Sequence, residues 1–124
     1  MRKIVVISIA SIFLVACNSA GSGKGNTEEK NDLTNNPVYQ KGLALVSQNK
    51  CFTCHTIDEP LTGPPYRQVA GKYAGMPDTI VSHLARKVIS GGTGVWGQIF
   101  MTAHPDISQA DAEAMVKYIL LLKK

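Results

Sequence analysis

Hydrophobic and polar positions divide the chain into three parts. The first sixteen residues start with a basic pair and continue as an almost uninterrupted apolar run from Ile4 to Val15. Residues 17–36 are mostly Gly, Ser, Asn and charged residues without an apolar period, a composition that cannot offset its own ordering entropy. Apolar residues recur at helical spacing only beyond residue 36. We therefore expect a leader over 1–16, a flexible tether over 17–36 and one folded domain over 37–124.

The folded domain is expected to be all-α. Apolar residues at helical spacing predict four helices, over residues 38–49, 69–73, 79–89 and from 109 to the C-terminus. Ser108 followed by Asp111 is an N-cap signal for the last helix. No stretch alternates convincingly with a period of two, and the Gly- and Pro-rich segments 58–68 and 91–105 are expected to be long loops.

Gly42 interrupts the first predicted helix. A glycine inside a helix costs about 1 kcal/mol relative to alanine, so a compensating role is expected. We interpret Gly42 as a point where another helix crosses closely, with Tyr118 of the last helix as its aromatic partner.

The composition fits a single small domain that needs a cross-link or a bound group for stability. The chain has 124 residues, three cysteines and 6% aromatic residues, and small domains often depend on a disulfide, metal or cofactor. These totals exclude a multidomain enzyme, a polytopic membrane protein and a disulfide-rich scaffold. The formal charge of +4 includes Arg2 and Lys3 of the leader. Without the leader, the net positive charge is too small to predict nucleic-acid binding.

The leader ends in Leu14-Val15-Ala16-Cys17. This string resembles the lipobox of bacterial lipoproteins, which implies cleavage before Cys17 and acylation of its sulfur. Acyl chains anchor a protein stably when more than one is present. The expected product is an exported, membrane-anchored lipoprotein facing the periplasm or the cell exterior. An ordinary leader with a chance cysteine, or a short uncleaved anchor, is the alternative.

The string Cys51-Phe52-Thr53-Cys54-His55 predicts covalent attachment of one haem c. Two thiols three residues apart can add to the two vinyl groups along one porphyrin edge, and the adjacent His55 can offer a nitrogen to iron. A thioredoxin-like dithiol would need a βαβ context, and a tetrahedral zinc site would need a second ligand pair. A plain disulfide would leave His55 without a role.

The sixth iron ligand is expected to be Met101. This residue follows an apolar stretch in a long loop, and a thioether facing the ring would give His/Met ligation, which raises the reduction potential. His104 in the same loop is the main rival. Three further residues remain as weaker candidates, with core packing favoured for the last: Met76, His83 and Met115.

Several further strings make residues 38–124 resemble a small single-haem class I bacterial cytochrome c. They are Gly63-Pro64-Pro65-Tyr66, Lys72-Tyr73-Ala74-Gly75, Gly94-Val95-Trp96-Gly97 and Ile99-Phe100-Met101. The resemblance implies the cytochrome c fold, in which the N- and C-terminal helices cross and shorter helices and long loops wrap the haem. It also implies that the Pro64 carbonyl orients His55, and that Trp96 and Lys87, or Arg86, contact a haem propionate. Trp96 as core filler and Lys87 as a solvated charge are the structural alternatives.

The chain departs from the family pattern around the methionine. Phe100 stands where relatives often have proline, so the loop is expected to open more easily. Thr102-Ala103-His104 replaces the family's Pro-Pro-Asn, which removes an amide partner for the Met101 sulfur and places a second potential ligand nearby.

The expected function is electron transfer by a monomeric carrier that is not an enzyme. The resemblance implies redox partner proteins: a quinol-oxidising complex on one side, and a terminal oxidase or anaerobic reductase on the other. The tether would keep the carrier near these membrane partners. A haem-based gas or redox sensor with a displaceable Met101 is the alternative function, and a small peroxidase-like enzyme would need an open iron site.

Overall fold

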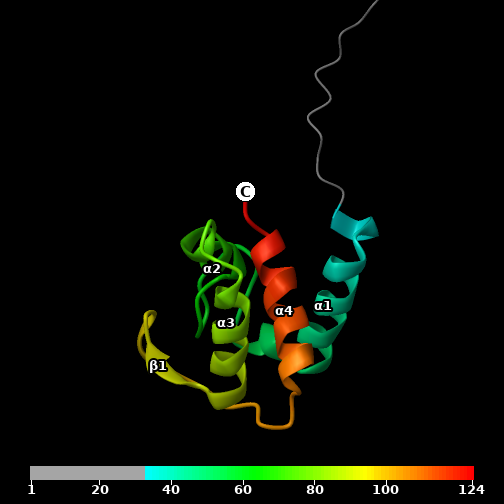
Figure 1. The fold of residues 1–124 in the computed structure, drawn as a ribbon. Coiled ribbons are helices and arrows are strands. Elements are labelled where there is room, and N and C mark those ends of the chain that lie inside the picture. The colour runs from blue at the N-terminus through cyan, green and yellow to red at the C-terminus, as the bar shows by residue number, and fades with distance from the viewer. Residues whose placement is uncertain (1–32) are drawn as a thin grey trace, which may run out of the picture.

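A computed structural model describes residues 33–124, so the predicted leader, most of the tether and Cys17 lie outside the described residues. Four α-helices dominate this part of the chain (Figure 1). They are α1 (Pro37–Gln48), α2 (Tyr66–Tyr73), α3 (Thr79–Ser90) and α4 (Gln109–Leu121). Short 3-10 helices, η1 (Leu33–Asn35) and η2 (Cys51–Thr53), flank α1. Within residues 33–124, no helix is long and apolar enough to cross a membrane.

Helix α4 is the centre of the fold. It packs against α1 on one side and against α2 and α3 on the other (Figure 1). The crossing with α1 occurs at Gly42, where a Cβ atom would overlap the Tyr118 Cβ and the Ala114 carbonyl oxygen. Tyr39 of α1 then meets Tyr118 edge-on, with ring centroids 5.0 Å apart. The predicted close crossing of the terminal helices at Gly42 is confirmed.

The helix ends follow the chemistry of the capping residues. The Asn36 side chain accepts hydrogen bonds from the Val38 and Tyr39 amides, and Pro37 occupies the first turn, where it is tolerated. At α4, the Ser108 hydroxyl accepts from the Asp111 amide, as its N-cap position predicts. Helix α4 ends at Leu121, short of the C-terminus, and α2 begins three residues earlier than the apolar pattern indicates.

Residues 91–105 are not entirely a loop. They contain an antiparallel hairpin of β1 (Gly92–Gly94) and β2 (Gly97–Met101), with an irregular register between Gly92 and Gly94. The three glycines of the hairpin, Gly92, Gly94 and Gly97, have positive φ, a conformation that glycine adopts readily. With so many glycines, these short strands lack the alternating β-branched residues that identify longer strands in a sequence. The prediction that this segment is irregular is wrong, whereas the prediction of a mainly helical fold is confirmed.

The hydrophobic core lies where α4 meets the other three helices. Its residues are almost all aliphatic or tyrosine, and no polar or charged side chain is fully buried among the described residues. The largest side chains that are almost completely buried are those of Tyr118, Met115 and Val46.

Candidate haem site

The two thiols and His55 lie in one tight turn directly after α1. Lys50 adopts the left-handed conformation, with φ of 56°, and this ends the helix and starts η2. The amides of Cys54 and His55 both donate to the Cys51 carbonyl, at 3.2 and 3.0 Å. Cys51 is half-buried, Cys54 is exposed, and the two are free thiols. Both sulfurs are therefore available on one short helical turn.

The imidazole of His55 is held at one nitrogen. Its Nδ1 lies 2.8 Å from the Pro64 carbonyl oxygen, which can accept a hydrogen bond from Nδ1–H. This bond selects the tautomer in which Nε2 carries a lone pair. The structure thus brings Pro64 to the position that the sequence predicts, and leaves Nε2 available to bind a metal.

Two further residues fix the plane of the imidazole. The Tyr66 ring stacks on the His55 ring with centroids 5.2 Å apart and an interplanar angle of 17°. Gly63 also approaches the ring so closely that a Cβ atom there would lie 2.7 Å from Nδ1. The Gly63 amide donates to the Cys54 carbonyl at 2.8 Å, which ties the loop to the thiol turn. The sequence interpretation gave neither Gly63 nor Tyr66 a role, although both belong to the string around Pro64.

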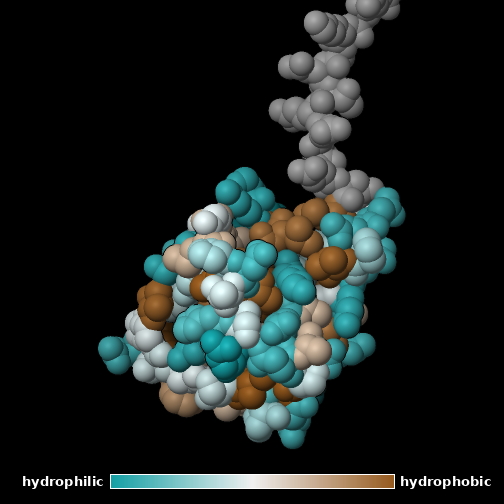
Figure 2. All heavy atoms as spheres, in the orientation of Figure 1, coloured by the Kyte–Doolittle hydropathy of each residue, from teal (hydrophilic) through white to brown (hydrophobic). Residues whose placement is uncertain are grey.

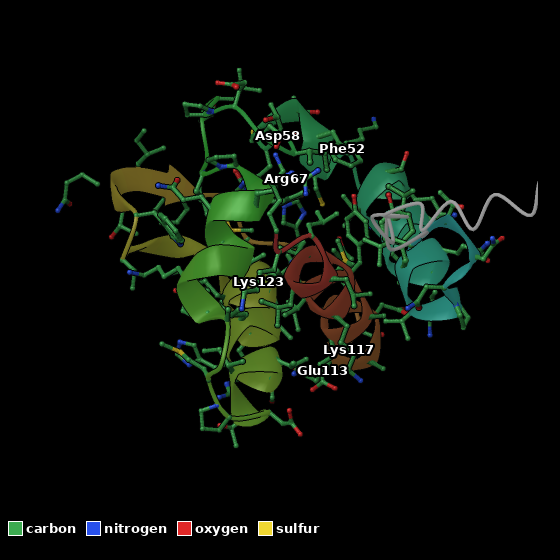
Figure 3. The ribbon with its side chains drawn as sticks, turned by 90° about the horizontal axis from the view of Figure 1, so that it is seen from above. Phe52, Asp58, Arg67, Glu113, Lys117 and Lys123 are labelled. Carbon is green, nitrogen blue, oxygen red and sulfur yellow. The ribbon has the colours of Figure 1, made fainter. Side chains whose placement is uncertain are left out.

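An ion pair anchors the segment between His55 and Pro64 to the rest of the domain. The Arg67 Nε donates to the Asp58 carboxylate at 2.6 Å, and its Nη1 donates to the Leu122 carbonyl at 2.9 Å (Figure 3). The guanidinium therefore joins the segment that orients His55 to α2 and to the end of α4. No sequence motif singled out Asp58 or Arg67, because their pairing depends on the fold.

Burial keeps the Cys51 thiol and the Tyr66 phenol uncharged. Desolvation is the main reason that the pKa of Cys51 is raised and that the pKa of Tyr66 is raised far above its ordinary range. Both groups are consequently neutral near pH 7. An uncharged, partly desolvated surface at Cys51 and Tyr66 favours contact with a large apolar macrocycle.

The candidate sixth ligands occupy different environments. Met101 is the last residue of β2, is half-buried and pairs with Gly92. His104 follows in the next turn, where its amide donates to the Ile89 carbonyl at 3.0 Å. Met115 is 2% exposed in the core of α4, which agrees with the packing role favoured from the sequence. The other two weak candidates, Met76 and His83, are exposed.

Trp96 lies at the turn of the hairpin and contacts α2. Its ring meets Tyr73 edge-on, with centroids 6.5 Å apart, and the Lys72 ammonium lies 5.5 Å from its centroid. Both contacts hold the hairpin against α2.

Lys87 is also bound to the hairpin. Its ammonium donates to the Thr93 carbonyl at 2.7 Å. The neighbouring Arg86 instead donates to Ser82, one turn back on the same helix. An ammonium has three N–H groups, so the bond to Thr93 is compatible with the propionate contact expected for Lys87.

The donor set fits a covalently attached haem. Two unpaired thiols and one free imidazole nitrogen lie within five consecutive residues, and the region around them contains half-buried and exposed apolar groups. Within residues 33–124, no group of three or more His, Cys, Asp or Glu side chains could hold a metal ion. The large apolar side chains that remain exposed are Val38, Leu61, Met76, Val95, Ile99 and Phe100.

Comparison with known proteins decides the family. The family model for cytochrome c matches residues 39–123, which is most of the chain. The chain belongs to the cytochrome c family. It therefore carries one covalently bound haem c, for which Cys51 and Cys54 fit the attachment motif. Like other cytochromes c, it transfers electrons to and from protein partners and is not an enzyme.

The most similar relatives include small bacterial cytochromes of about the size of the folded domain. Cytochrome c-552 of Nitrosomonas europaea is 40% identical over 84 residues, which are 68% of this chain and 81% of that protein. Cytochrome c-551 of Azotobacter vinelandii is 39% identical over 84 residues, 68% of this chain and all of that protein. The crystal structure of the Nitrosomonas europaea cytochrome c552 superimposes with a TM-score of 0.61, covering 65% of this chain and 99% of that one.

Proposed function

We propose that this cytochrome c is a single-electron carrier anchored to a membrane by lipid on Cys17, with His55 and Met101 as the two axial ligands of its iron. The observation that supports the assignment of His55 is the hydrogen bond from its Nδ1 to the Pro64 carbonyl, 2.8 Å long. It leaves Nε2 as the donor atom and fixes the ring plane.

The protein supports electron transfer by holding its ligands still. Bound haem c supplies the one-electron couple. Pro64, Gly63 and Tyr66 confine the imidazole of His55 by a hydrogen bond, by steric contact and by stacking. A ligand that does not move between oxidation states keeps the reorganisation energy low. Met101 completes the set from the end of a strand that Lys87 ties to α3 through the hairpin.

Met101 is favoured over its rivals by its place in the fold. Met115 packs in the core at 2% exposure, which favours a packing role over iron ligation. His83 lies exposed on α3. The backbone of His104 is bonded to Ile89 outside the hairpin, whereas Met101 is in the hairpin itself. With both axial positions filled by the chain, the iron would have no open site for a substrate or a gas.

The lipid anchor is supported by the string Leu14-Val15-Ala16-Cys17 after a short apolar leader. The same leader would direct export of the chain. A flexible tether over the sixteen residues 17–32 would span about 22 Å r.m.s.. The anchor would hold the domain near membrane-bound partners, for which we propose a quinol-oxidising complex as donor and a terminal oxidase or anaerobic reductase as acceptor.

An optical spectrum of the oxidised holoprotein tests the ligand assignment. We expect the weak long-wavelength band of methionine-bound ferric haem, its loss in Met101→Ala and its retention in Met115→Leu. Loss of the band in neither variant, or its absence from the wild type at neutral pH, would reject Met101. Carbon monoxide binding to the reduced native protein would instead indicate an open or displaceable site, as in a sensor.

The anchor has a separate test. We expect the mass of the mature N-terminal peptide to include acyl groups on Cys17, and Cys17→Ser to move the cytochrome from the membrane to the soluble fraction. An unmodified Cys17 in a membrane-bound holoprotein would contradict the lipoprotein assignment.

A further inference from the structure

An apolar groove opens at the end of the domain where the N-terminal segment joins it. Its volume is about 300 Å³, and it is lined by Asn36, Val38, Lys117, Leu120 and Leu121. The groove lies between the start of α1 and the end of α4. Figure 2 shows hydrophobic side chains gathered at this end of the domain, beside the point where the preceding chain leaves it.

The apolar residues of the groove are incompletely covered, although Leu120 also packs against the core. Val38 is 42% exposed although it occupies the first turn of α1, and Leu120 and Leu121 are only half-buried. These side chains stand apart from the thiol turn, because α1 separates the two. The eleven helical steps from Pro37 to Gln48 separate these residues by about 16 Å along the helix axis. The groove therefore does not belong to the haem site.

One basic side chain, Lys117, lines the groove and is exposed. Lys123 follows α4 and is also exposed, but in Figure 3 it lies on the side of α4 away from α1. Within residues 33–124, neither lysine forms an ion pair with a carboxylate. The nearest acidic side chains along the sequence accept hydrogen bonds from neutral neighbours, Glu113 from Gln109 at 2.9 Å and Asp111 from Ser108 at 2.8 Å. The combination is an apolar strip with unpaired positive charge at its edge.

We propose that this end of the domain docks on the surface of an anionic phospholipid bilayer. The location of the groove argues for this occupant, because the segment that would carry the lipid on Cys17 enters the domain at Asn36, in the groove wall. Apolar side chains inserted at the headgroup level and lysines near anionic headgroups are the two elements of such a contact. The inference rests on the proposed tether, which brings the surface to a bilayer.

Docking would orient the carrier. With the groove on the bilayer, the thiol turn lies at the far end of α1, facing away from the lipid. A tethered domain would then spend less time in orientations that direct the haem at the membrane, and encounters with partner proteins that project from the membrane would be more productive.

The experiment uses the mature holoprotein, residues 17–124, exported behind a cleavable secretory leader and carrying Cys17→Ser. Because this chain has no acyl group, vesicle binding reports the groove alone. Co-sedimentation is measured with vesicles of phosphatidylcholine and of phosphatidylcholine with an equal amount of phosphatidylglycerol, at low ionic strength, where the Debye length is about 30 Å. We expect binding to the anionic vesicles only, and its release by high salt.

Two variants and their matched controls locate the contact. Lys117→Glu and Val38→Asp should each weaken binding about tenfold, since each surface lysine contributes a severalfold change in affinity. Val38→Asp should still fold, because an acidic residue in the first turn of a helix is favourable. Arg86→Glu and Gln40→Glu make the same charge changes elsewhere, the second on the opposite face of α1, and should change binding less than twofold.

Three results would overturn the proposal. They are no binding of the unacylated chain to anionic vesicles, equal weakening by Lys117→Glu and Arg86→Glu, and binding that Val38→Asp leaves unchanged. Absence of acyl groups on native Cys17 would reject the proposed tether and would leave the vesicle result intact, so the two failures are distinguishable.

Discussion

Gly63 lies against the face of the His55 ring, where a Cβ atom would come within 2.7 Å of Nδ1 and 2.9 Å of Nε2. Any other residue at this position must therefore push the imidazole away from the Pro64 carbonyl, or move the loop. We expect Gly63→Ala to lower the free energy of unfolding of the holoprotein by about 1–3 kcal/mol, the usual cost of overpacking. It should also change the resonances of the axial imidazole in the NMR spectrum of the ferric protein.

Gly71→Ala is the matched control for a glycine replacement. Gly71 lies in α2 with open space around its α-carbon, so alanine should stabilise the helix by about 0.5–1 kcal/mol. Unchanged imidazole resonances in Gly63→Ala would show that His55 is not confined by this glycine.

The crossing of α1 and α4 gives a second test of a close approach. A Cβ atom at position 42 would overlap Tyr118 and the backbone of Ala114, neither of which can rotate away. We expect Gly42→Ala to lower the free energy of unfolding by at least 2 kcal/mol despite the better helix propensity of alanine. Denaturant titration against wild type and Gly71→Ala measures this. A stabilised Gly42→Ala would mean that the helices can separate at little cost.

The sequence predicted well those features that local chemistry determines. Ser108 and Asp111 predict the start of α4, because a helix cap is formed by residues that are close in sequence. Gly42 likewise predicts the crossing with Tyr118, because a glycine inside a helix indicates a close contact. The spacing of Cys51, Cys54 and His55 is likewise a local pattern.

The remaining features depend on residues brought together from distant parts of the chain. Arg67 and Leu122 are joined by a hydrogen bond although 55 positions separate them, and no pattern within either segment signals it. The hairpin was missed for another reason. Its strands are held by positive-φ glycines and by Lys87, so they lack the apolar alternation that identifies a strand.

Tyr118 should make the domain sensitive to alkaline pH. Burial is the main reason that its pKa rises from the ordinary value of 10 to about 12. Between these values the unfolded chain loses the phenolic proton while the folded chain retains it, so the free energy of unfolding falls as the pH rises from about 10 to about 12. The slope from this group is at most about 1.4 kcal/mol per pH unit.

Tyr118→Phe isolates this contribution. The phenyl ring can keep the edge contact with Tyr39 but has no proton to lose. We expect the unfolding free energy of the wild type to fall relative to that of the variant as the pH is raised from 9 toward 11. Parallel pH dependences of the two proteins would contradict the assignment. The effect of the substitution on the pH dependence should be the same in the ferrous and ferric proteins, because Tyr118 is part of the helix core.

Lys87 should stabilise the hairpin that ends in Met101. Its ammonium donates to the Thr93 carbonyl at 2.7 Å on the exposed side of the domain, so the net contribution is modest. We expect Lys87→Met, which keeps the apolar stem, to cost about 1 kcal/mol and to speed amide hydrogen exchange within the hairpin. Arg86→Met removes the neighbouring cation, whose bond stays within α3, and should leave exchange in the hairpin unchanged. Equal exchange in both variants would show that Thr93 does not depend on Lys87.

Removal of the haem should unfold most of the domain. The helices have between 8 and 13 residues, lengths that are marginal without tertiary packing. The aromatic content of 6% is low, and a bound macrocycle would supply the apolar surface that the side chains do not. We expect the Cys51→Ala/Cys54→Ala apoprotein to lose most of its far-UV helical signal and its cooperative thermal transition, whereas Cys17→Ser, a cysteine replacement far from the thiol turn, keeps both. A sharp thermal transition in the double variant would mean that the core around Val46, Met115 and Tyr118 is sufficient to fold the chain by itself.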